Sequence, residues 1–436
     1  MTTIYADGFK ARPYWWEAAA PTTEGSVPLP DETDVAIVGA GYAGLSAALE
    51  LARNGTRVSV LEKLDFGSGA STLSGGAVSS GISIGRGLSG SRNQADEFLR
   101  GASESFDHVD AIIAREGIAC NWEKTGRFVG AYTSRHYANL SAMADNLNRT
   151  SAAGARKVPR SEQRQEIDSD FYRGGLVIER SGKLHPALYH RGLLEAARRA
   201  GAMLTAGAHV THYDRDSDRF VLHTSAGKLR AREVAICTNG YTEASTPELR
   251  RRIIPVASHI IATEPLAPDL AASLFPNRRT MSETKRVLCY YRLAPDGSRL
   301  VFGGRARFTR GTPTTIAPIL HRFMSERLPQ LSGTRITHCW TGNVAFSFDF
   351  IPHMGMMNGM HYAVGCNGSG VAMMSYLGHA IARKILSGGN RACPFDREEF
   401  PGQFGYTGTP WFLPIVGAYY RTRDAYDRLR DPQAPA

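Results

Sequence analysis

Cysteine is scarce in this chain, with six residues among 436. They are scattered at Cys120, Cys237, Cys289, Cys339, Cys366 and Cys393. No two of them form a CxxC pair, and none stands beside histidines at the spacing of a zinc site. The pattern argues against a disulfide framework, and we expect no metal centre.

Long apolar runs are lacking as well. No window approaches the roughly 18 to 20 consecutive apolar residues that a membrane-spanning helix requires. The opening, MTTIYADGFKARPYWW, has no apolar core of the kind found in secretion signals. We therefore expect a soluble, cytoplasmic protein without a membrane span.

A basic stripe interleaved with aromatic residues is also lacking. Lys and Arg number 51 against 41 Asp and Glu, which gives a formal charge of +10. Without such a stripe, the charge favours a basic solvated surface first, an anionic ligand second and nucleic acid last. We expect no nucleic-acid partner. The apolar share of 42% and the charged share of 21% are typical of globular proteins, and this length predicts two joined domains.

A strand–helix–strand unit follows the first 30 residues. Residues 34–38 (DVAIV) form an apolar, β-branched run, 44–55 (GLSAALELARNG) a helical pattern, and 57–61 (RVSVL) a second run. The connection carries GAGYAG, in which Gly39 permits a tight turn, Gly41 admits a pyrophosphate and Gly44 lets helix pack on strand. We assign Gly39, Ala40, Gly41, Tyr42, Ala43 and Gly44 to a dinucleotide site at the N-terminus of the helix.

Glu62 ends the second strand, 18 residues after Gly44. An acidic side chain there accepts hydrogen bonds from both ribose hydroxyls of an adenosine and repels a 2′-phosphate, so NADP is disfavoured. Lys63 follows it and joins the site. FAD and NAD share this fingerprint, so later segments must distinguish them.

Three later segments favour FAD. They are 69–76 (GASTLSGG), 237–241 (CTNGY) and 366–372 (CNGSGVA). The first two could also be an ordinary loop and a turn. The third places glycines at the start of the last helix, whose positive end suits the N1–C2=O edge of a flavin. The candidates are Ser71, Thr72, Ser74, Gly75, Gly76, Thr238, Gly240, Gly368, Ser369, Gly370 and Val371, with Val210 from a strand near 208–213.

The motifs, in this order, resemble the glycine oxidase and D-amino-acid oxidase (DAO) family of FAD enzymes over nearly the whole chain. They include GAST, GKLHPALY, AICTNGY, IIATEPL and GCNGSGVAM. The segment WTGNVAFSFDFIPHMG resembles the family's W-x-G…D-x-x-P-x-x-G beside the flavin, which adds Gly342 and Asp349 to the cofactor site. The opening YADGFKARPYWWEAAAP and the phrase YYRLAPDG most resemble the gamma-glutamylputrescine oxidase branch, which oxidises amines.

The resemblance implies an α/β fold in which a Rossmann-like FAD-binding domain of the glutathione-reductase type interleaves with an α+β substrate domain on a mostly antiparallel sheet. We expect an N-terminal arm at 1–27, a discontinuous FAD-binding domain at 28–92, 183–252 and 336–400, a substrate domain at 93–182 and 253–335, and a C-terminal tail at 401–436. The region from about 91 to 179 has a helical, polar pattern.

Two departures from the family pattern concern the flavin. Leu73 stands where some relatives tether flavin through a histidine, and 342–343 stand near the cysteine tether of monomeric sarcosine oxidases. The resemblance therefore implies a non-covalent FAD. Residues 300–302 (LVF) stand near the oxygen-activating lysine of those oxidases, which keeps the electron acceptor open.

Substrate contact needs other residues. An arginine can grip a carboxylate through two parallel hydrogen bonds, although an arginine on a strand is more often a surface residue. Arg292 matches the position from which the family's amino-acid oxidases hold the substrate carboxylate, and Arg305 is the second choice. Tyr290 and Tyr291 alternate on their strand, so that one faces the site and the other the packing; our substrate-contact candidate is Tyr291. His259 and His353 complete the candidates, with ordinary structural histidines as the alternative.

No Ser-His-Asp, Cys-His or paired-carboxylate arrangement stands out, and hydride transfer from a neutral amine needs no obligatory base. We therefore predict an FAD enzyme that takes a hydride from the carbon next to an amine nitrogen, giving an imine that hydrolyses. Molecular oxygen is the expected acceptor. The alternatives are a dehydrogenase that serves a quinone or carrier protein and, remotely, a non-catalytic flavin-binding protein. The amine and the number of subunits stay open.

Overall fold

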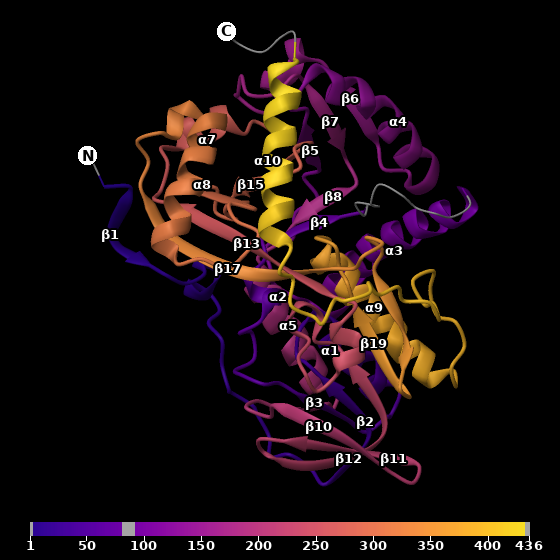
Figure 1. The fold of residues 1–436 in the computed structure, drawn as a ribbon. Helices are drawn as coiled ribbons and strands as arrows, with labels where there is room; N and C mark the ends of the chain where they lie inside the picture. The colour runs from indigo at the N-terminus through magenta and orange to yellow at the C-terminus, as the bar shows by residue number, and fades with distance from the viewer. Residues whose placement is uncertain (1–2, 81–91, 432–436) are drawn as a thin grey trace.

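Two large sheets organise the computed structural model, which describes residues 3–80 and 92–431. Figure 1 shows them in separate lobes, with the eight-stranded sheet at the bottom and the nine-stranded sheet above it. The predicted α/β architecture is confirmed. No helix of the described ranges is long and apolar enough to cross a bilayer.

The eight-stranded sheet has the order β10-β11-β12-β2-β3-β9, and β19 extends it by pairing with β12 and β18. Its strands are β2 (Glu32–Val38), β3 (Val58–Leu61), β9 (Met203–Thr205), β10 (Val210–Asp216), β11 (Arg219–Thr224), β12 (Gly227–Ile236), β18 (His353–Met357) and β19 (Met360–Val364). Its helices are α1 (Tyr42–Arg53), α3 (Arg92–Glu116), α5 (Pro186–Arg199) and α9 (Gly370–Leu386). β2 runs parallel to β3 and β12 in the middle of the sheet, which explains its nearly unbroken apolar run.

The nine-stranded sheet has the order β1-β17-β13-β16-β15-β14-β5-β7-β6 and is antiparallel except at β1–β17 and β14–β5. Its strands are β1 (Tyr5–Lys10), β5 (Arg127–Gly130), β6 (Ala155–Val158), β7 (Gly175–Ile178), β13 (Ile254–Thr263), β14 (Thr280–Glu283), β15 (Cys289–Leu293), β16 (Leu300–Gly304) and β17 (Ile336–Phe346). Its helices are α4 (Ser134–Ser151), α7 (Pro268–Leu274), α8 (Pro313–Arg327) and α10 (Leu413–Leu429). The apolar cluster under α8 buries one face of the sheet, and the other face turns toward the lower lobe.

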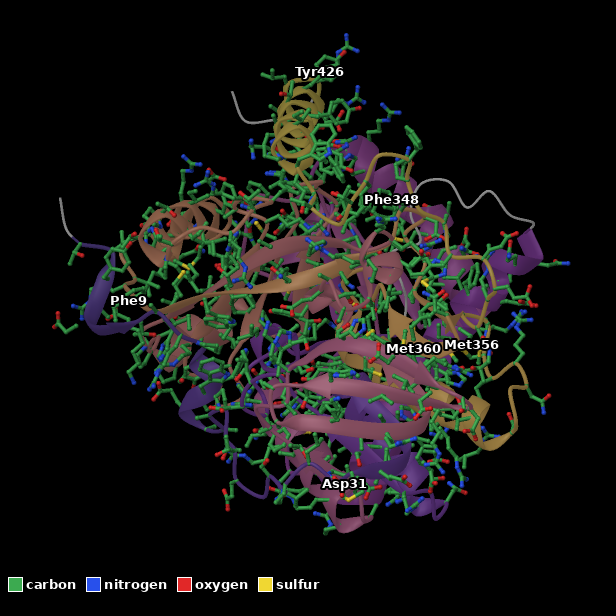
Figure 2. The ribbon with its side chains drawn as sticks, turned by 60° about the horizontal axis from the view of Figure 1, so that its bottom comes forward. Phe9, Asp31, Phe348, Met356, Met360 and Tyr426 are labelled. Atoms are coloured by element: carbon green, nitrogen blue, oxygen red, sulfur yellow. The ribbon has the colours of Figure 1, made fainter. Side chains whose placement is uncertain are left out.

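Short elements complete the two lobes. They are α2 (Ala70–Leu73), α6 (Pro247–Arg250), the pair β4 (Ala77–Ser79) and β8 (Ser181–Lys183), and the 3-10 helices η1 (Tyr14–Glu17), η2 (Arg160–Gln165), η3 (Asn239–Tyr241) and η4 (Pro329–Leu331). Figure 2 places Asp31, just before β2, and Tyr426, on α10, at opposite ends of the molecule. The two lobes are therefore stacked end to end.

The strands depart from the predicted domain boundaries at two places and from the predicted secondary structure at one. β17 lies within the segment 336–400 assigned to the FAD domain, yet it pairs with β13 in the nine-stranded sheet. β1 lies within the predicted arm and pairs with β17. The region expected to be helical also contains β5, β6 and β7, which were missed because each is only four residues long. Residues 81–91 of the predicted 28–92 segment lie outside the described residues.

Candidate active site

A cavity of about 420 Å³ opens between the two sheets. On the lower side it is lined by the GAGYAG turn and by residues of 69–76, 236–239 and 366–371. On the upper side its walls come from β5, β14, β15 and the end of β16. Its volume lies within the roughly 300 to 1,000 Å³ of small-molecule sites. One space therefore joins the dinucleotide loops to the second domain.

The GAGYAG turn is packed too tightly for side chains. Gly39 has a φ of +103°, a backbone conformation that favours glycine. A Cβ on Gly44 would lie 1.9 Å from the carbonyl oxygen of Gly39, so the start of α1 rests directly on the turn. The first N–H groups of α1 have no partner within the helix, and this end of α1 faces the cavity. The turn can therefore present N–H donors to a pyrophosphate.

Glu62 lines the same end of the cavity. Its Oε2 accepts a hydrogen bond from the backbone N–H of Ala40 at 3.0 Å, and its Oε1 accepts one from Leu64 at 3.2 Å. Burial raises the pKa of this carboxyl above its ordinary value. The carboxylate keeps lone pairs for the hydroxyls of a ribose.

His190, which the sequence analysis did not single out, supports the turn from α5. Its Nε2 lies 2.7 Å from the carbonyl oxygen of Ala40. Because a carbonyl can only accept, Nε2 carries the proton and donates. Burial lowers the pKa of His190 to about 4, so the ring is neutral and holds the turn without adding charge.

Residues 69–76 and α9 form the next part of the wall. Ser71 accepts a hydrogen bond on Oγ from the backbone N–H of Tyr42 at 3.1 Å, which joins the two cofactor segments. At the start of α9, Gly368 has a φ of +97°, and a Cβ there would have no heavy atom within 4 Å. The positive end of this 17-residue helix therefore faces open cavity. A reduced flavin gathers negative charge on one edge, which this helix end would stabilise.

The upper end of the cavity is polar. The hydroxyl groups of Tyr290 and Ser258 lie 2.9 Å apart, and the Nε of Arg127 donates to Ser282 Oγ at 2.8 Å. Arg305 follows β16 and lines the same wall. Its guanidinium lies over the ring of Phe346, 4.9 Å from the centroid. Burial lowers the pKa of Arg127 to about 10, so this side chain stays charged at neutral pH.

These groups fit FAD. The donor-rich end of α1 suits a pyrophosphate, the carboxylate of Glu62 suits a ribose, and the start of α9 suits a flavin ring. The family described as FAD dependent oxidoreductase (DAO) matches residues 34–384. The chain belongs to this family. Its cofactor is accordingly FAD, and among residues 3–80 and 92–431 no group of three metal-ligating side chains is found.

Known proteins similar to this chain of the DAO family span most of its length. The gamma-glutamylputrescine oxidoreductase of Escherichia coli is 30% identical over 90% of this chain and 92% of its own. The probable oxidoreductase OrdL of Haemophilus influenzae is 30% identical over 91% and 93%. The crystal structure of glycine oxidase from Geobacillus kaustophilus superposes with a TM-score of 0.73 at 21% identity, covering 85% of this chain and all of that one. This last likeness establishes the shared fold.

Most residues assigned to FAD from the sequence line the cavity. They are Gly39, Ala40, Gly41, Tyr42, Ala43, Glu62, Lys63, Ser71, Ser74, Gly75, Gly76, Val210, Thr238, Gly342, Gly368, Ser369, Gly370 and Val371. Four others do not. Gly44 and Gly240 pack against backbone, Thr72 bonds to Trp16 and to the Gly67 carbonyl, and the Asp349 carboxylate accepts from His353.

Arg292 does not line the cavity, contrary to what its match to the family position led us to expect. Its side chain projects from the same face of β15 as Tyr290, but it is only 2% exposed. Its NH2 group donates to the carbonyl oxygen of Leu184 at 2.6 Å, and Trp15 of the N-terminal arm covers the guanidinium, 5.1 Å from the ring centroid. Trp15 of the arm therefore covers Arg292, and Arg305 is the predicted arginine that lines the cavity.

Tyr291 lies on the packing face of β15, so the choice between the two tyrosines is corrected to Tyr290. The Tyr291 hydroxyl shares a hydrogen bond of 2.7 Å with that of Tyr172, and its ring stacks on Phe302. Alternation along the strand forces one of the pair inward, but the sequence pattern does not tell which one.

Neither candidate histidine lines the cavity. The Nε2 of His259 lies 3.2 Å from the carbonyl oxygen of Arg307, and its Nδ1 lies 2.8 Å from Thr341 Oγ1. His353 bonds through Nε2 to Asp349 at 2.9 Å and stacks on Phe400. The ring of His259 is therefore satisfied within the fold, as lone histidines usually are. His353 is held through Nε2, and its buried Nδ1 has no hydrogen-bond partner among the described residues.

Arg127 is one of the cavity residues that sequence reasoning missed. It begins β5, in the block interpreted as helical. The alternation in RFVG, in which the side chains of Arg127 and Val129 share one face, was the available signal. Its neighbour across the sheet, Ser282 on β14, is 155 residues away in the chain, so only the fold brings them together.

Proposed function

We propose that this DAO-family protein oxidises the CH–NH bond of an amine or N-substituted amino acid, giving an imine that hydrolyses. The single observation that carries the proposal is the one cavity joining the FAD loops to a polar pocket on the nine-stranded sheet. The names of two relatives, gamma-glutamylputrescine oxidoreductase and glycine oxidase, concern an amine derivative and an amino acid, and support the substrate class.

The proposed cofactor contacts follow from the chain. The start of α1 would hold the pyrophosphate, Glu62 the ribose, and the start of α9 the N1–C2=O edge of the flavin. When bound, FAD supplies a hydride acceptor at N5. The cavity walls would orient the amine so that its C–H faces N5. They would also keep water away from the reacting atoms.

Tyr290 limits the proton chemistry of the proposed reaction. Burial raises the pKa of its hydroxyl to about 12, so at neutral pH this group donates hydrogen bonds and does not act as a base. His259, whose pKa burial lowers to about 4, lies outside the cavity lining. The amine would therefore bind in its neutral form, having lost its proton to solvent before hydride transfer.

Molecular oxygen is the proposed electron acceptor. A specific observation favours a second candidate, a quinone or carrier protein. Lys63 is the one lysine among the described lining residues, and it lies at the adenosine end, so this part of the chain places no ammonium group beside the proposed flavin position. The 300–302 segment, where an oxygen-activating lysine was considered, is buried and apolar. Reoxidising the reduced protein with air and, separately, with a soluble quinone distinguishes the two acceptors.

The test of the function is anaerobic reduction of the bound flavin. Purified protein would be mixed with a panel of primary amines, N-methyl amino acids and gamma-glutamyl amines. We expect at least one compound to bleach the visible flavin absorbance and to yield the corresponding carbonyl product. A flavin that dithionite reduces but that no compound of the panel bleaches would refute the proposed function.

A further inference from the structure

We infer that the outer face of α10 docks the protein on a membrane surface that contains anionic lipids. The inference goes beyond the proposed function, because it concerns an attachment surface outside the cavity and no step of the reaction. Its basis is a helix that is apolar on the side turned away from the protein and that carries arginines along both edges of that side.

The outward side of α10 is apolar although it is exposed. Among residues 3–80 and 92–431, twelve large hydrophobic side chains are exposed, and five of them lie between residues 411 and 429. Leu429 is 85% exposed, Trp411 70% and Ile415 65%. Exposed apolar residues are otherwise scattered singly over protein surfaces, so a concentration of this kind marks an interaction surface.

The spacing of these residues gathers them in one stripe. In a helix, residues three, four and seven apart share a face. Counting from Ile415, these intervals give an uncharged and exposed set that we call the outer stripe: Ile415, Ala418, Tyr419, Thr422, Ala425, Tyr426 and Leu429. Trp411, four residues before Ile415, continues the same spacing toward the start of the helix.

The opposite side of α10 fixes the helix on the upper lobe. Gly417 is buried against Phe308, and a Cβ at this glycine would lie 2.7 Å from that ring. Asp424 is buried as well, and its carboxylate accepts a hydrogen bond from the backbone N–H of Val287 at 2.9 Å. These contacts determine which side of the helix faces solvent. Figure 2 shows the end of α10 that carries Tyr426 at the outer edge of the molecule.

The charges of α10 are divided between the same two sides. Its acidic side chains are used within the fold, because Asp424 and Asp427 both pair with Arg286. The exposed charges are positive and flank the outer stripe, one on the first edge and two on the second, at about 100° per residue. They are Arg421, Arg423 and Arg430. In the described part of the chain, none of the three forms an ion pair within the 4.0 Å limit.

An apolar stripe with positive edges suits the surface of a bilayer. A helix that lies along a membrane buries its apolar face where the headgroups meet the acyl chains, and basic residues at its edges attract anionic lipids. Trp and Tyr are favoured at this depth because they combine an apolar ring with a polar group, and the surface offers Trp411, Tyr419 and Tyr426. Arginine stems can follow the apolar surface while the guanidinium groups reach lipid phosphates. In this arrangement α10 lies on the bilayer and does not cross it.

A second copy of the chain suits the outer stripe less well. An interface between two identical copies around a two-fold axis uses the same patch on both sides. The exposed arginines of both copies would then meet, and α10, all of whose residues are described, has no exposed acidic side chain to pair with them. Like charges that face each other oppose association. An anionic lipid surface has the complementary charge.

The inner side of α10 reaches toward the cavity. The ring of Tyr420 lies 6.0 Å from that of Phe308. Phe308 follows Arg305, which lines the cavity, by three residues. Docking by α10 would therefore hold the lobe that carries the upper wall of the cavity against the membrane.

The test measures binding of the holoprotein to lipid vesicles by sedimentation at physiological salt. Vesicles of pure phosphatidylcholine are compared with mixed vesicles of equal parts phosphatidylcholine and phosphatidylglycerol. We expect wild type to sediment with the mixed vesicles and to bind the pure ones at least tenfold more weakly. Trp411 is the one exposed tryptophan of the five in the chain, so the mixed vesicles should shift the tryptophan emission to shorter wavelength, and Trp411→Phe should remove that shift.

A first triple variant removes the apolar contribution. Ile415→Ser, Tyr419→Ser and Leu429→Ser together should weaken binding to the mixed vesicles at least tenfold, because the apolar area that enters the lipid is lost. Met143→Ser, at an exposed position of α4, is the matched control and should bind like wild type. Unchanged FAD content and melting temperature check that the variants keep the fold.

A second triple variant removes the charges at the edges of the stripe. Arg421→Gln, Arg423→Gln and Arg430→Gln together should weaken binding to the mixed vesicles by about 100-fold, at about fivefold for each arginine near an anionic surface. Arg322→Gln, on the exposed face of α8, is the matched control and should bind like wild type.

Three results would overturn the inference. The first is wild type that stays in the supernatant with the mixed vesicles. The second is equal vesicle binding by wild type and either triple variant. The third is a wild-type dimer in sedimentation velocity that the serine variant alone does not form, which would assign the stripe to a second copy. Bleaching of the flavin by amines bears on the proposed function only, so either proposal can fail without the other.

Discussion

Gly378 sets the distance between the two helices whose N-termini face the cofactor. A Cβ at this position in α9 would lie 2.0 Å from the carbonyl oxygen of Ala43 in α1. Ordinary contact begins at 3.4 Å, so Gly378→Ala forces a separation of about 3.4 − 2.0 = 1.4 Å. The clash is with backbone, which cannot move aside as a flexible side chain would.

Two effects oppose each other in the free energy of unfolding. Replacing glycine by alanine inside a helix gains about 1 kcal/mol, whereas overpacking costs about 1 to 3 kcal/mol. We therefore expect the apoprotein to lose at most about 2 kcal/mol. FAD binding should suffer more. A shift of α1 relative to α9 by 1.4 Å exceeds the range of hydrogen-bond lengths. Losing one hydrogen bond to a charged phosphate weakens FAD binding by about 10- to 150-fold.

The assay is FAD titration of the apoprotein, followed by the quenching of flavin fluorescence, together with thermal unfolding. Gly378→Ser should be worse than Gly378→Ala, because the added hydroxyl enlarges the clash. Gly333→Ala, whose Cβ has no heavy atom within 4 Å, is the control and should match wild type. Unchanged FAD affinity and unchanged thermal stability in Gly378→Ala would refute the reasoning.

Other predictions concern the cofactor and the buried charges. Gly41→Val should abolish FAD binding, because its side chain would fill the space against Ser71 where the pyrophosphate lies; equilibrium dialysis with FAD measures this, and wild-type affinity would show the assignment of the turn to be wrong. Acid or heat denaturation should release intact FAD into the supernatant, whereas flavin retained by the precipitate would show a covalent bond. Folding lowers the pKa of His190 from 6.5 to about 4. As the pH falls, the unfolded chain therefore binds a proton at this residue before the folded chain does. The stability that the neutral ring contributes is complete above pH 6.5 and is lost as the pH falls toward 4. His190→Asn should flatten the decline of the melting temperature over that window, and an unchanged slope would count against a neutral His190. Arg292→Met should keep the wild-type rate of anaerobic flavin reduction by the amines of the panel, because the side chain does not line the cavity; a loss of that rate would return Arg292 to the substrate site.

The cofactor half of the site was predictable because its signals are local. GAGYAG stands between a strand and its helix, found as β2 and α1, and the glycines of 366–372 stand at the start of a helix, found as α9. Each of these depends on neighbouring residues whose spacing alone defines the geometry.

The substrate half was less predictable because it depends on pairings across the chain. Arg127 and Ser282 meet only through the β5–β14 pairing. Arg292 stays out of the cavity lining because Trp15 of the N-terminal arm covers its guanidinium. A strand pattern can tell that Tyr290 and Tyr291 face opposite ways, but the direction of each is set by which sheet face the second lobe covers.

The central claim is that the bound flavin takes a hydride from the carbon next to an amine nitrogen. Its most direct test is anaerobic stopped-flow reduction by a saturating amine, compared with the same amine carrying deuterium on that carbon. The account predicts complete bleaching of the flavin, with a slower rate for the deuterated compound and one carbonyl product per flavin reduced. A flavin that stays oxidised with every amine, or one that bleaches without forming the carbonyl product, would contradict it.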